Sequence, residues 1–271
     1  MTSRRRGRSL DLSDLPLAEI RARLAEVATP SLEGRLLRAL ERDPRRGARA
    51  LAEVVARRVA ARRAEARRIA RLFALRRALL AEGARAIAGV DEVGVGPLAG
   101  PVVAAAVVLP PRVHLPGLND SKQVRREHRE RLDREIRAQA LAVCVAEVAA
   151  TEVDRINVLR ASIEAMRRAV VGLDIPLDHV FVDARTIPDL AVPQTSLIDG
   201  DAREGTIAAA SIVAKVHRDA LMQRLDAAHP GYGFGRHKGY ATREHLVALE
   251  RLGPSPCHRR SFAPVSQLSL L

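Results

Sequence analysis

The sequence has 271 residues, of which 47% are hydrophobic, and it carries a formal net charge of +13. This hydrophobic fraction is typical of globular proteins and excludes a collagen-like or fully disordered chain. No stretch approaches the roughly 18 uninterrupted apolar residues of a membrane span, so we expect a protein that has no membrane segment, is not exported and works in the cytoplasm. Cys144 and Cys257 lie far apart and fit neither a zinc motif nor a disulfide framework.

The positive charge is concentrated in the N-terminal third of the chain. Residues 1–82 hold 21 Arg against 10 acidic residues, whereas residues 83–271 hold 24 basic against 22 acidic residues. Apolar residues between 51 and 80 recur every three or four positions with arginines between them, which predicts amphipathic helix that starts near Asp43-Pro44. We therefore predict a basic helical extension over 1–82 and a second domain over 83–271. A basic arm attracts nucleic acid or anionic membrane, although an arginine-rich composition also solvates an ordinary helix.

After Gly83 the pattern changes to short apolar runs, turns and further helices. The first half of one helix, 207–214, is apolar almost all round and is expected to be buried. A basic tail at 258–262 follows the last helix. The sequence thus predicts an α/β fold, with strands at 86–93, 102–109, 141–148, 179–182 and 195–198, and helices at 124–137, 157–171, 206–228 and 243–251.

Four acidic residues follow or end these strands. Asp91 and Glu92 end the first apolar run, Asp183 ends the run at 180–182, and Asp201 follows the run that ends at Ile198. Each alone reads as an ordinary loop acid, but four such acids suggest one cluster. A cluster would repel itself unless divalent cations were bound, and hard oxygen ligands suit a pair of Mg²⁺ or Mn²⁺ ions, the usual arrangement for attack on a phosphodiester.

Two further patterns point to nucleic acid. Only three of the 45 basic residues are lysines, Lys122, Lys215 and Lys238, so each is a candidate for a position that needs a compact ammonium. Residues 231–240 gather three of the six aromatic side chains with cations and glycines, as a nucleic-acid contact surface would, although a buried aromatic turn has the same composition. The glycines at 94–100 do not form a dinucleotide-binding loop, because Pro97 and Pro101 intervene and a strand follows.

Taken together, these motifs resemble the ribonuclease HII family, the bacterial type 2 ribonucleases H. The resemblance covers about residues 86–265, in family order, and the segment before it resembles the helical extension of some members. The matching segments are AGVDEVG (88–94), GPLAGPV (96–102), GLNDSK (117–122), VDRIN (153–157), VD (182–183), GDA (200–202), IAAASIVAKV (207–216) and HKGY (237–240).

The resemblance implies a ribonuclease H-like mixed sheet flanked by helices, with a helical C-terminal lobe after the basic extension. It implies a monomeric, metal-dependent endonuclease that hydrolyses RNA in RNA/DNA hybrids. It also implies cleavage 5′ of single ribonucleotides embedded in duplex DNA, for ribonucleotide removal, with 3′-hydroxyl and 5′-phosphate ends. By position, the resemblance implies that two Mg²⁺ or Mn²⁺ ions are bound by Asp91, Glu92, Asp183 and Asp201. It implies that the turn Gly94-Val95-Gly96 contacts the ribose 2′-hydroxyl and that Tyr240 packs on the neighbouring deoxyribose. Phosphate contacts are implied for Ser121, Lys122 and Lys238.

The sequence departs from the family at Val95, where members usually carry a basic residue. We expect a weaker phosphate contact there rather than loss of chemistry. Lys215 is left with two open roles, in the site or in support of the acids. The alternatives are a catalytically weakened hybrid-binding protein, to which Val95 gives some support, and another ribonuclease H-like nuclease such as a resolvase or a type 3 ribonuclease H. The arm could be a duplex tether, a partner-binding helix or a cap.

Overall fold

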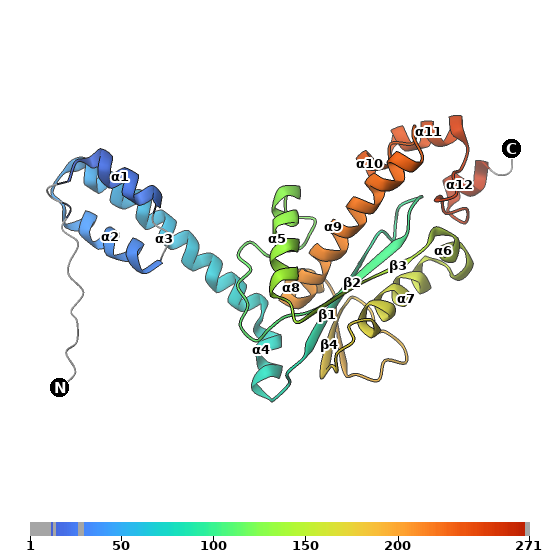
Figure 1. The fold of residues 1–271 in the computed structure, drawn as a ribbon, viewed down its shortest axis with the longest axis horizontal. Helices are drawn as coiled ribbons and strands as arrows, with labels where there is room; N and C mark the ends of the chain where they lie inside the picture. Colours follow the sequence, from blue (N-terminus) through green and yellow to red (C-terminus); the bar gives the residue numbers. More distant parts are fainter. Residues whose placement is uncertain (1–11, 13–14, 27–29, 269–271) are drawn as a thin grey trace. The chain divides into compact units, whose positions relative to one another are not determined.

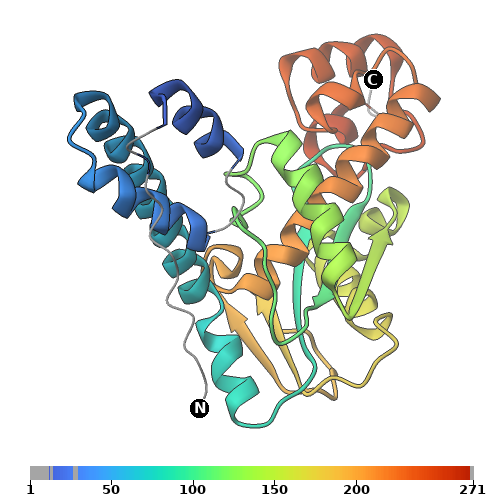
Figure 2. The ribbon, with the colours of Figure 1, turned by 60° about the vertical axis from the view of Figure 1, so that its left-hand side comes forward.

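The computed structural model describes residues 12, 15–26 and 30–268, and it divides the chain into two compact units, Met1–Arg68 and Ile69–Leu271. Figures 1 and 2 show the ribbon in two views. Within the described residues, no helix combines the length and the apolar character that crossing a bilayer requires.

The first unit is built from helices, as predicted. Helices α1 (Leu17–Glu26), α2 (Pro30–Arg42) and the first part of α3 (Arg46–Leu72) pack around a small apolar core that includes Ile20, Leu40 and Val55. The turn before α3 is held by Arg45, whose guanidinium donates to the Asp43 carboxylate and to the carbonyl oxygens of Leu12 and Leu15. The helix start expected near Asp43-Pro44 is therefore confirmed. Arginines 57, 58, 63 and 67 of α3 are exposed.

The second unit begins inside α3 and continues through α4 (Ala74–Ala81). The sequence predicted no break between these helices, because the apolar spacing continues through it. The break falls at Phe73, which turns into the core and lies so close to Gly205 that a Cβ on that glycine would meet the ring at 2.3 Å. The division of the chain into functional domains at residue 82 stays a prediction.

A mixed five-stranded sheet forms the centre of the second unit. Its strands are β1 (Ile87–Val93), β2 (Val102–Val108), β3 (Ala142–Val148), β4 (His179–Asp183) and β5 (Gln194–Leu197), and their order is β3-β2-β1-β4-β5. β1, β2 and β3 pair antiparallel, whereas β4 runs parallel to both β1 and β5. All five predicted strands are present, so the α/β fold is confirmed.

Helices cover both faces of this sheet (Figure 1). On one face α7 (Val158–Val171) packs against the sheet, and on the other lie α9 (Gly205–Ala228) and α5 (Arg126–Gln139). Successive side chains of β2 point to opposite faces of the sheet. Ala104 and Ala106 join the apolar core on the α7 side, whereas Ala105 and Val107 join the apolar core on the α9 side. α9 comes close to β1 at Gly89, where a Cβ would lie 2.2 Å from the Thr206 backbone.

A helical C-terminal lobe follows α9, as the resemblance implied. It contains α10 (Phe234–His237), α11 (Arg243–Leu252) and α12 (Ala263–Leu268), and it packs on the far part of α9 (Figure 1). The expected basic tail at 258–262 is wrong in one respect: His258 and Arg259 are 1% and 0% exposed. The short helices α6 (Ala150–Ile156), α8 (Gly200–Arg203), α10 and α12 were not predicted.

Candidate active site

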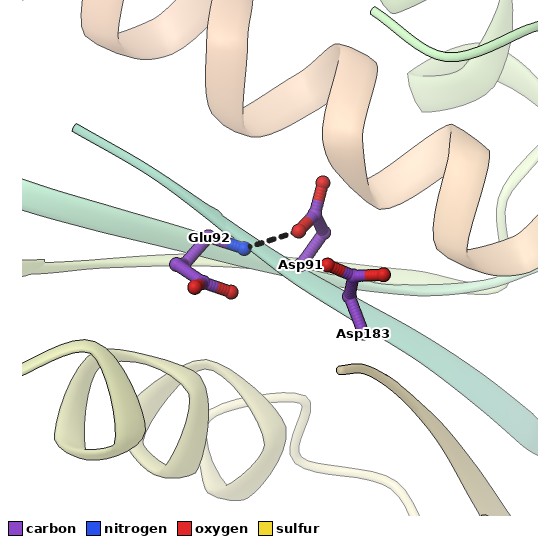
Figure 3. Close-up of side chains that lie close together, drawn as sticks. All are labelled: Asp91, Glu92 and Asp183. Atoms are coloured by element: carbon purple, nitrogen blue, oxygen red, sulfur yellow. Dashed lines mark hydrogen bonds between the residues drawn. The ribbon is translucent and has the colours of Figure 1, made fainter. Parts of the chain in front are cut away.

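Three carboxylates meet where β1 and β4 run side by side. Asp91 and Glu92 lie near the end of β1, and Asp183 is the last residue of β4. The two strands are parallel, with Val90 paired to Val182, so the residues that follow emerge at the same place on the sheet. One carboxylate oxygen from each acid lies within 4.8 Å of the others (Figure 3).

The adjacent acids Asp91 and Glu92 both reach this cluster although neighbouring strand residues alternate in direction. Figure 3 shows the two side chains leaving the strand in different directions. The Asp91 side chain bends back, and its Oδ1 accepts a hydrogen bond of 2.8 Å from the amide of Glu92. The strand end therefore places both carboxylates beside Asp183.

Asp201 lies next to this cluster but outside the set of three. It sits on α8, directly after Gly200, whose amide donates to Asp183 Oδ1 at 2.7 Å. The Asp201 side chain is buried, and its negative charge acts on both Asp91 and Asp183. Among the other acids, Asp120 raises the pKa of Asp201 the most, ahead of Asp183. The structure thus brings all four predicted acids to one region, with one carboxylate oxygen from each of three of them within 4.8 Å of the others.

Burial and mutual repulsion act on every acid in this region. Burial raises the pKa of Asp91 well above its ordinary value, and the charges of Glu92 and Asp183 raise it further. Burial also raises the pKa of Glu92 and of Asp183. Burial, followed by the charge of Asp120, raises the pKa of Asp201 to about 6. Such a cluster is costly without a cation to balance it.

The donor set fits a divalent metal ion. All candidate ligands are carboxylate oxygens, which Mg²⁺ and Mn²⁺ prefer. Glu92 Oε2 is buried and has no hydrogen-bond partner among the described residues, so it has an unused lone pair inside the cluster. The positive groups that act on Glu92 are Arg185, whose Nε lies 4.0 Å from Glu92 Oε1, and Lys122. The residues present therefore match the cation that the sequence predicted.

Ser121 and Lys122 lie at the edge of the same region. The Ser121 hydroxyl is buried and accepts a hydrogen bond of 2.9 Å from the Ser211 hydroxyl on α9, and Ser211 acts to lower the pKa of Asp91 against the larger effect of burial. Partial burial opposes protonation of Lys122, but the charges of the surrounding acids, led by Asp201, raise its pKa. Lys122 is exposed, so its ammonium combines access to solvent with proximity to the acids.

The turn that follows the acid pair faces Tyr240. Gly94 has a φ of +87°, and its α-carbon approaches Arg218 so closely that no Cβ could fit. Gly96 is exposed, and a Cβ built on it would lie 3.8 Å from Tyr240 Cε1. Tyr240 is 45% exposed, so its ring and the turn form one accessible surface beside the carboxylates.

The other two lysines make contacts within the protein. Lys238 Nζ donates to the carbonyl oxygen of Gly235 at 2.7 Å and lies 3.4 Å from that of Asp219. Lys215 forms an ion pair of 2.7 Å with the Asp219 carboxylate. The structure does not place either ammonium against the acid cluster, and the phosphate contact of Lys238 stays a prediction.

Several residues at the site were not singled out from the sequence. Asp120 was signalled by its place in the segment GLNDSK, but Ser211 stood in an apolar helix and carried no separate signal. The arginines were hidden by the abundance of this residue type. The residues missed are Asp120, Arg185, Ser211, Arg218 and Arg259.

The sequence model of the ribonuclease HII family matches residues 88–265, which include the whole acid cluster and Tyr240. The chain belongs to the ribonuclease HII family. It is 50% identical over 252 residues to a ribonuclease HII of Myxococcus xanthus, covering 93% of this chain and 86% of the relative. It is 48% identical over 260 residues to one of an Anaeromyxobacter species, covering 95% and 81%.

Solved structures show the same fold. The ribonuclease H2 of Pyrococcus horikoshii aligns with a TM-score of 0.56 and 24% identity, covering 68% of this chain and 97% of the other. A Bst ribonuclease HIII in complex with Mn²⁺ aligns with a TM-score of 0.57 and 20% identity, covering 69% and 70%. Membership of the family makes this chain a divalent-metal-dependent endoribonuclease that acts on RNA/DNA hybrids.

Proposed function

We propose that this chain cuts duplex DNA on the 5′ side of an embedded single ribonucleotide, in addition to hydrolysing RNA in longer hybrids, and leaves 3′-hydroxyl and 5′-phosphate ends. The proposal rests on three features that lie next to one another in the structure. The carboxylate cluster at the end of β1 runs directly into the turn at 94–96, and this turn faces the exposed ring of Tyr240.

In this proposal Asp91, Glu92, Asp183 and Asp201 hold two Mg²⁺ or Mn²⁺ ions. The ions supply an activated water and charge stabilisation for the leaving 3′-oxygen, so no nucleophilic side chain is needed. The chain's own part is to keep four carboxylates ionised and in place. Ser211 acts in this direction on Asp91, whose pKa it lowers, and the amide of Gly200 does so on Asp183 through a hydrogen bond that favours the charged form.

Selectivity for the ribonucleotide would come from the turn and the aromatic ring. The backbone of Gly94, Val95 and Gly96 contacts the 2′-hydroxyl, and a site that pairs with a hydroxyl discriminates strongly against the analogue that lacks it. Tyr240 packs on the next sugar, where the absence of a 2′-hydroxyl leaves room for a ring. The enzyme then reads a junction between sugars and not a base sequence.

Cationic and hydroxyl groups would position the phosphate backbone. Lys122 is exposed beside the acids, and Ser121 precedes it, so both suit a phosphate near the scissile bond. Lys238 lies farther along the same strand of substrate in this proposal. It would need to exchange its present carbonyl partners for phosphate oxygens.

The test is cleavage of an end-labelled DNA duplex that contains one ribonucleotide, with Mg²⁺ and Mn²⁺ in separate reactions and an all-DNA duplex as control. We expect one cut 5′ of the ribonucleotide, a 3′ end that a polymerase extends, and no cut in the control. A cut elsewhere, or equal cutting of the all-DNA duplex, would overturn the proposal. Tight binding with no turnover in either metal would instead support the hybrid-binding alternative.

A further inference from the structure

Two arginines are buried where the β1–β2 connection meets the C-terminal lobe. The side chains of Arg218, on α9, and Arg259, after α11, are both 0% exposed. No carboxylate in the described part of the chain lies within ion-pair distance of either guanidinium. A buried cation without an anion is expensive, so these side chains require another explanation.

Each guanidinium is satisfied by backbone carbonyl oxygens of the β1–β2 connection. Arg259 donates to the carbonyls of Gly94 at 2.5 Å, Val95 at 2.8 Å and Gly100 at 3.0 Å. Arg218 donates to Ala99, Pro101 and Lys238 over 3.0–3.2 Å. Arg259 thus ties the start of the connection to Gly100 near its end, and Arg218 ties that end to the segment that leads to Tyr240.

The bonds from Arg259 fix the direction of two amide hydrogens. In a trans peptide the C=O and the N–H of one plane point in opposite directions. Because the carbonyls of Gly94 and Val95 point inward to Arg259, the N–H groups of Val95 and Gly96 must point away from it. Neither amide donates a hydrogen bond to any other described residue, and Gly96 is exposed. Two unused donors are therefore presented beside the carboxylates.

The charge of Arg259 makes the amides of Val95 and Gly96 better hydrogen-bond donors. A cation bound to a carbonyl polarises the peptide and makes the N–H of the same plane a better donor. Burial and the charge of Arg218 lower the pKa of Arg259 to about 9, which still leaves the guanidinium protonated at neutral pH. The ring of Phe262, 5.1 Å from the guanidinium carbon, supports it from one side.

We propose that Arg259 is a positioning residue for ribonucleotide selectivity: by binding the carbonyls of Gly94 and Val95 it aims the amides of Val95 and Gly96 at the 2′-hydroxyl oxygen. This inference rests on the proposed function, because it explains how the turn at 94–96 can read that hydroxyl. Arg259 touches no substrate atom itself. The role requires several N–H donors held in one plane, which a guanidinium has and the ammonium of lysine lacks.

The test compares Arg259→Lys with a matched control, Arg76→Lys. Arg76 is also a buried arginine, 1% exposed, and its Nη2 also donates to carbonyls, those of Leu109 and Pro110, but it makes no bond to the 94–101 connection. The measurement is the ratio of dissociation constants for an all-DNA duplex and the same duplex with one ribonucleotide. Ca²⁺ replaces the catalytic ion, and a gel verifies that the duplex stays intact.

We expect Arg259→Lys to lower this ratio by about tenfold, because a hydrogen bond to a desolvated partner is worth roughly that factor. Arg76→Lys should lower the Tm by a similar amount and leave the ratio at the wild-type value. An unchanged ratio in Arg259→Lys, or an equal fall in Arg76→Lys, would overturn the inference. If the wild-type protein shows no preference at all, the proposed function fails instead.

A second variant keeps the test decisive if Arg259→Lys does not fold. Phe262→Leu retains the guanidinium and removes the ring that supports it. We expect a smaller fall in the same ratio, with binding of the all-DNA duplex unchanged. A folded Phe262→Leu protein with the full wild-type ratio would count against the inference.

Discussion

The hydroxyl of Ser211 links two parts of the site: it donates a hydrogen bond of 2.9 Å to the Ser121 hydroxyl, 90 residues away in the chain, and it acts to lower the pKa of Asp91. The buried helix α9 therefore carries a hydroxyl that acts on the carboxylate cluster. Through its bond to Ser121, the same hydroxyl also holds the segment that carries Lys122. Asp91 is one of the proposed metal ligands, and a residue that supports a ligand affects metal affinity without touching the metal.

We predict that Ser211→Ala weakens Mn²⁺ binding by about tenfold or more, because Asp91 loses the neighbouring hydroxyl that favours its ionised form. Titration calorimetry of the metal-free protein measures this directly. Ser162→Ala is the control, since Ser162 is also fully buried but bonds only to the Leu159 carbonyl of its own helix. Equal Mn²⁺ affinities for Ser211→Ala and the wild type would show that the link has no role.

Tyr240 can be altered without disturbing the fold. Its ring is 45% exposed, whereas its backbone carbonyl accepts a hydrogen bond from His245 that any residue would preserve. We predict that Tyr240→Ala lowers kcat/KM on a single-ribonucleotide duplex by about tenfold to a hundredfold, the size of one lost stacking contact. Tyr240→Phe should retain nearly all activity, because the contact is made by the ring. A Tyr240→Phe protein as impaired as Tyr240→Ala would exclude stacking.

Val95 has its carbonyl bound to Arg259 and its side chain half-buried at the surface. We predict that Val95→Arg tightens binding of ribonucleotide-containing duplex by about tenfold, through a new charge-assisted phosphate contact. The salt dependence of binding should also become steeper. Val95→Gln adds length without charge and is the control. No gain in affinity from arginine would refute the idea that valine weakens this contact.

The C-terminal lobe contains a histidine pair that makes its stability depend on pH. His245 and His258 are buried, with their Nε2 atoms 3.0 Å apart, and the Nδ1 of His258 accepts from the amide of Ser255. Burial, followed by the neighbouring histidine, lowers the pKa of His258 from 6.5 to about 4. Between these values the unfolded chain binds more protons than the folded one, so the free energy of unfolding falls as the pH is lowered.

We therefore predict that His258→Asn flattens the pH dependence of the unfolding free energy between pH 6.5 and about pH 4, the window set by the two pKa values. Above this window both proteins should show parallel curves. Urea unfolding at a series of pH values measures how the unfolding free energy changes with pH. His128→Asn is the control, because His128 is exposed. A wild-type slope in His258→Asn would mean that this pair does not titrate on unfolding.

The sequence predicted the strands and the acid cluster because both rest on local signals. A run of apolar residues that ends in Asp91-Glu92 or Asp183 identifies both the strand and the acid at its end. Arg259 had no such signal, since an arginine in an arginine-rich chain reads as solvated surface. Only the tertiary structure shows that the carbonyls of the β1–β2 connection enclose it. The break at Phe73 was missed for the same reason, because contact with Gly205 causes it.

In the proposed mechanism, carboxylates from different strands converge to hold the metal that drives cleavage. The most direct test is the Mn²⁺ dependence of single-ribonucleotide cleavage by Asp183→Asn. Asparagine keeps an oxygen that can accept from the Gly200 amide, so the fold should persist while the ligand charge is lost. We predict a fall in rate of about a hundredfold or more that excess Mn²⁺ does not restore. Cleavage at the wild-type rate with the wild-type Mn²⁺ dependence would contradict the account.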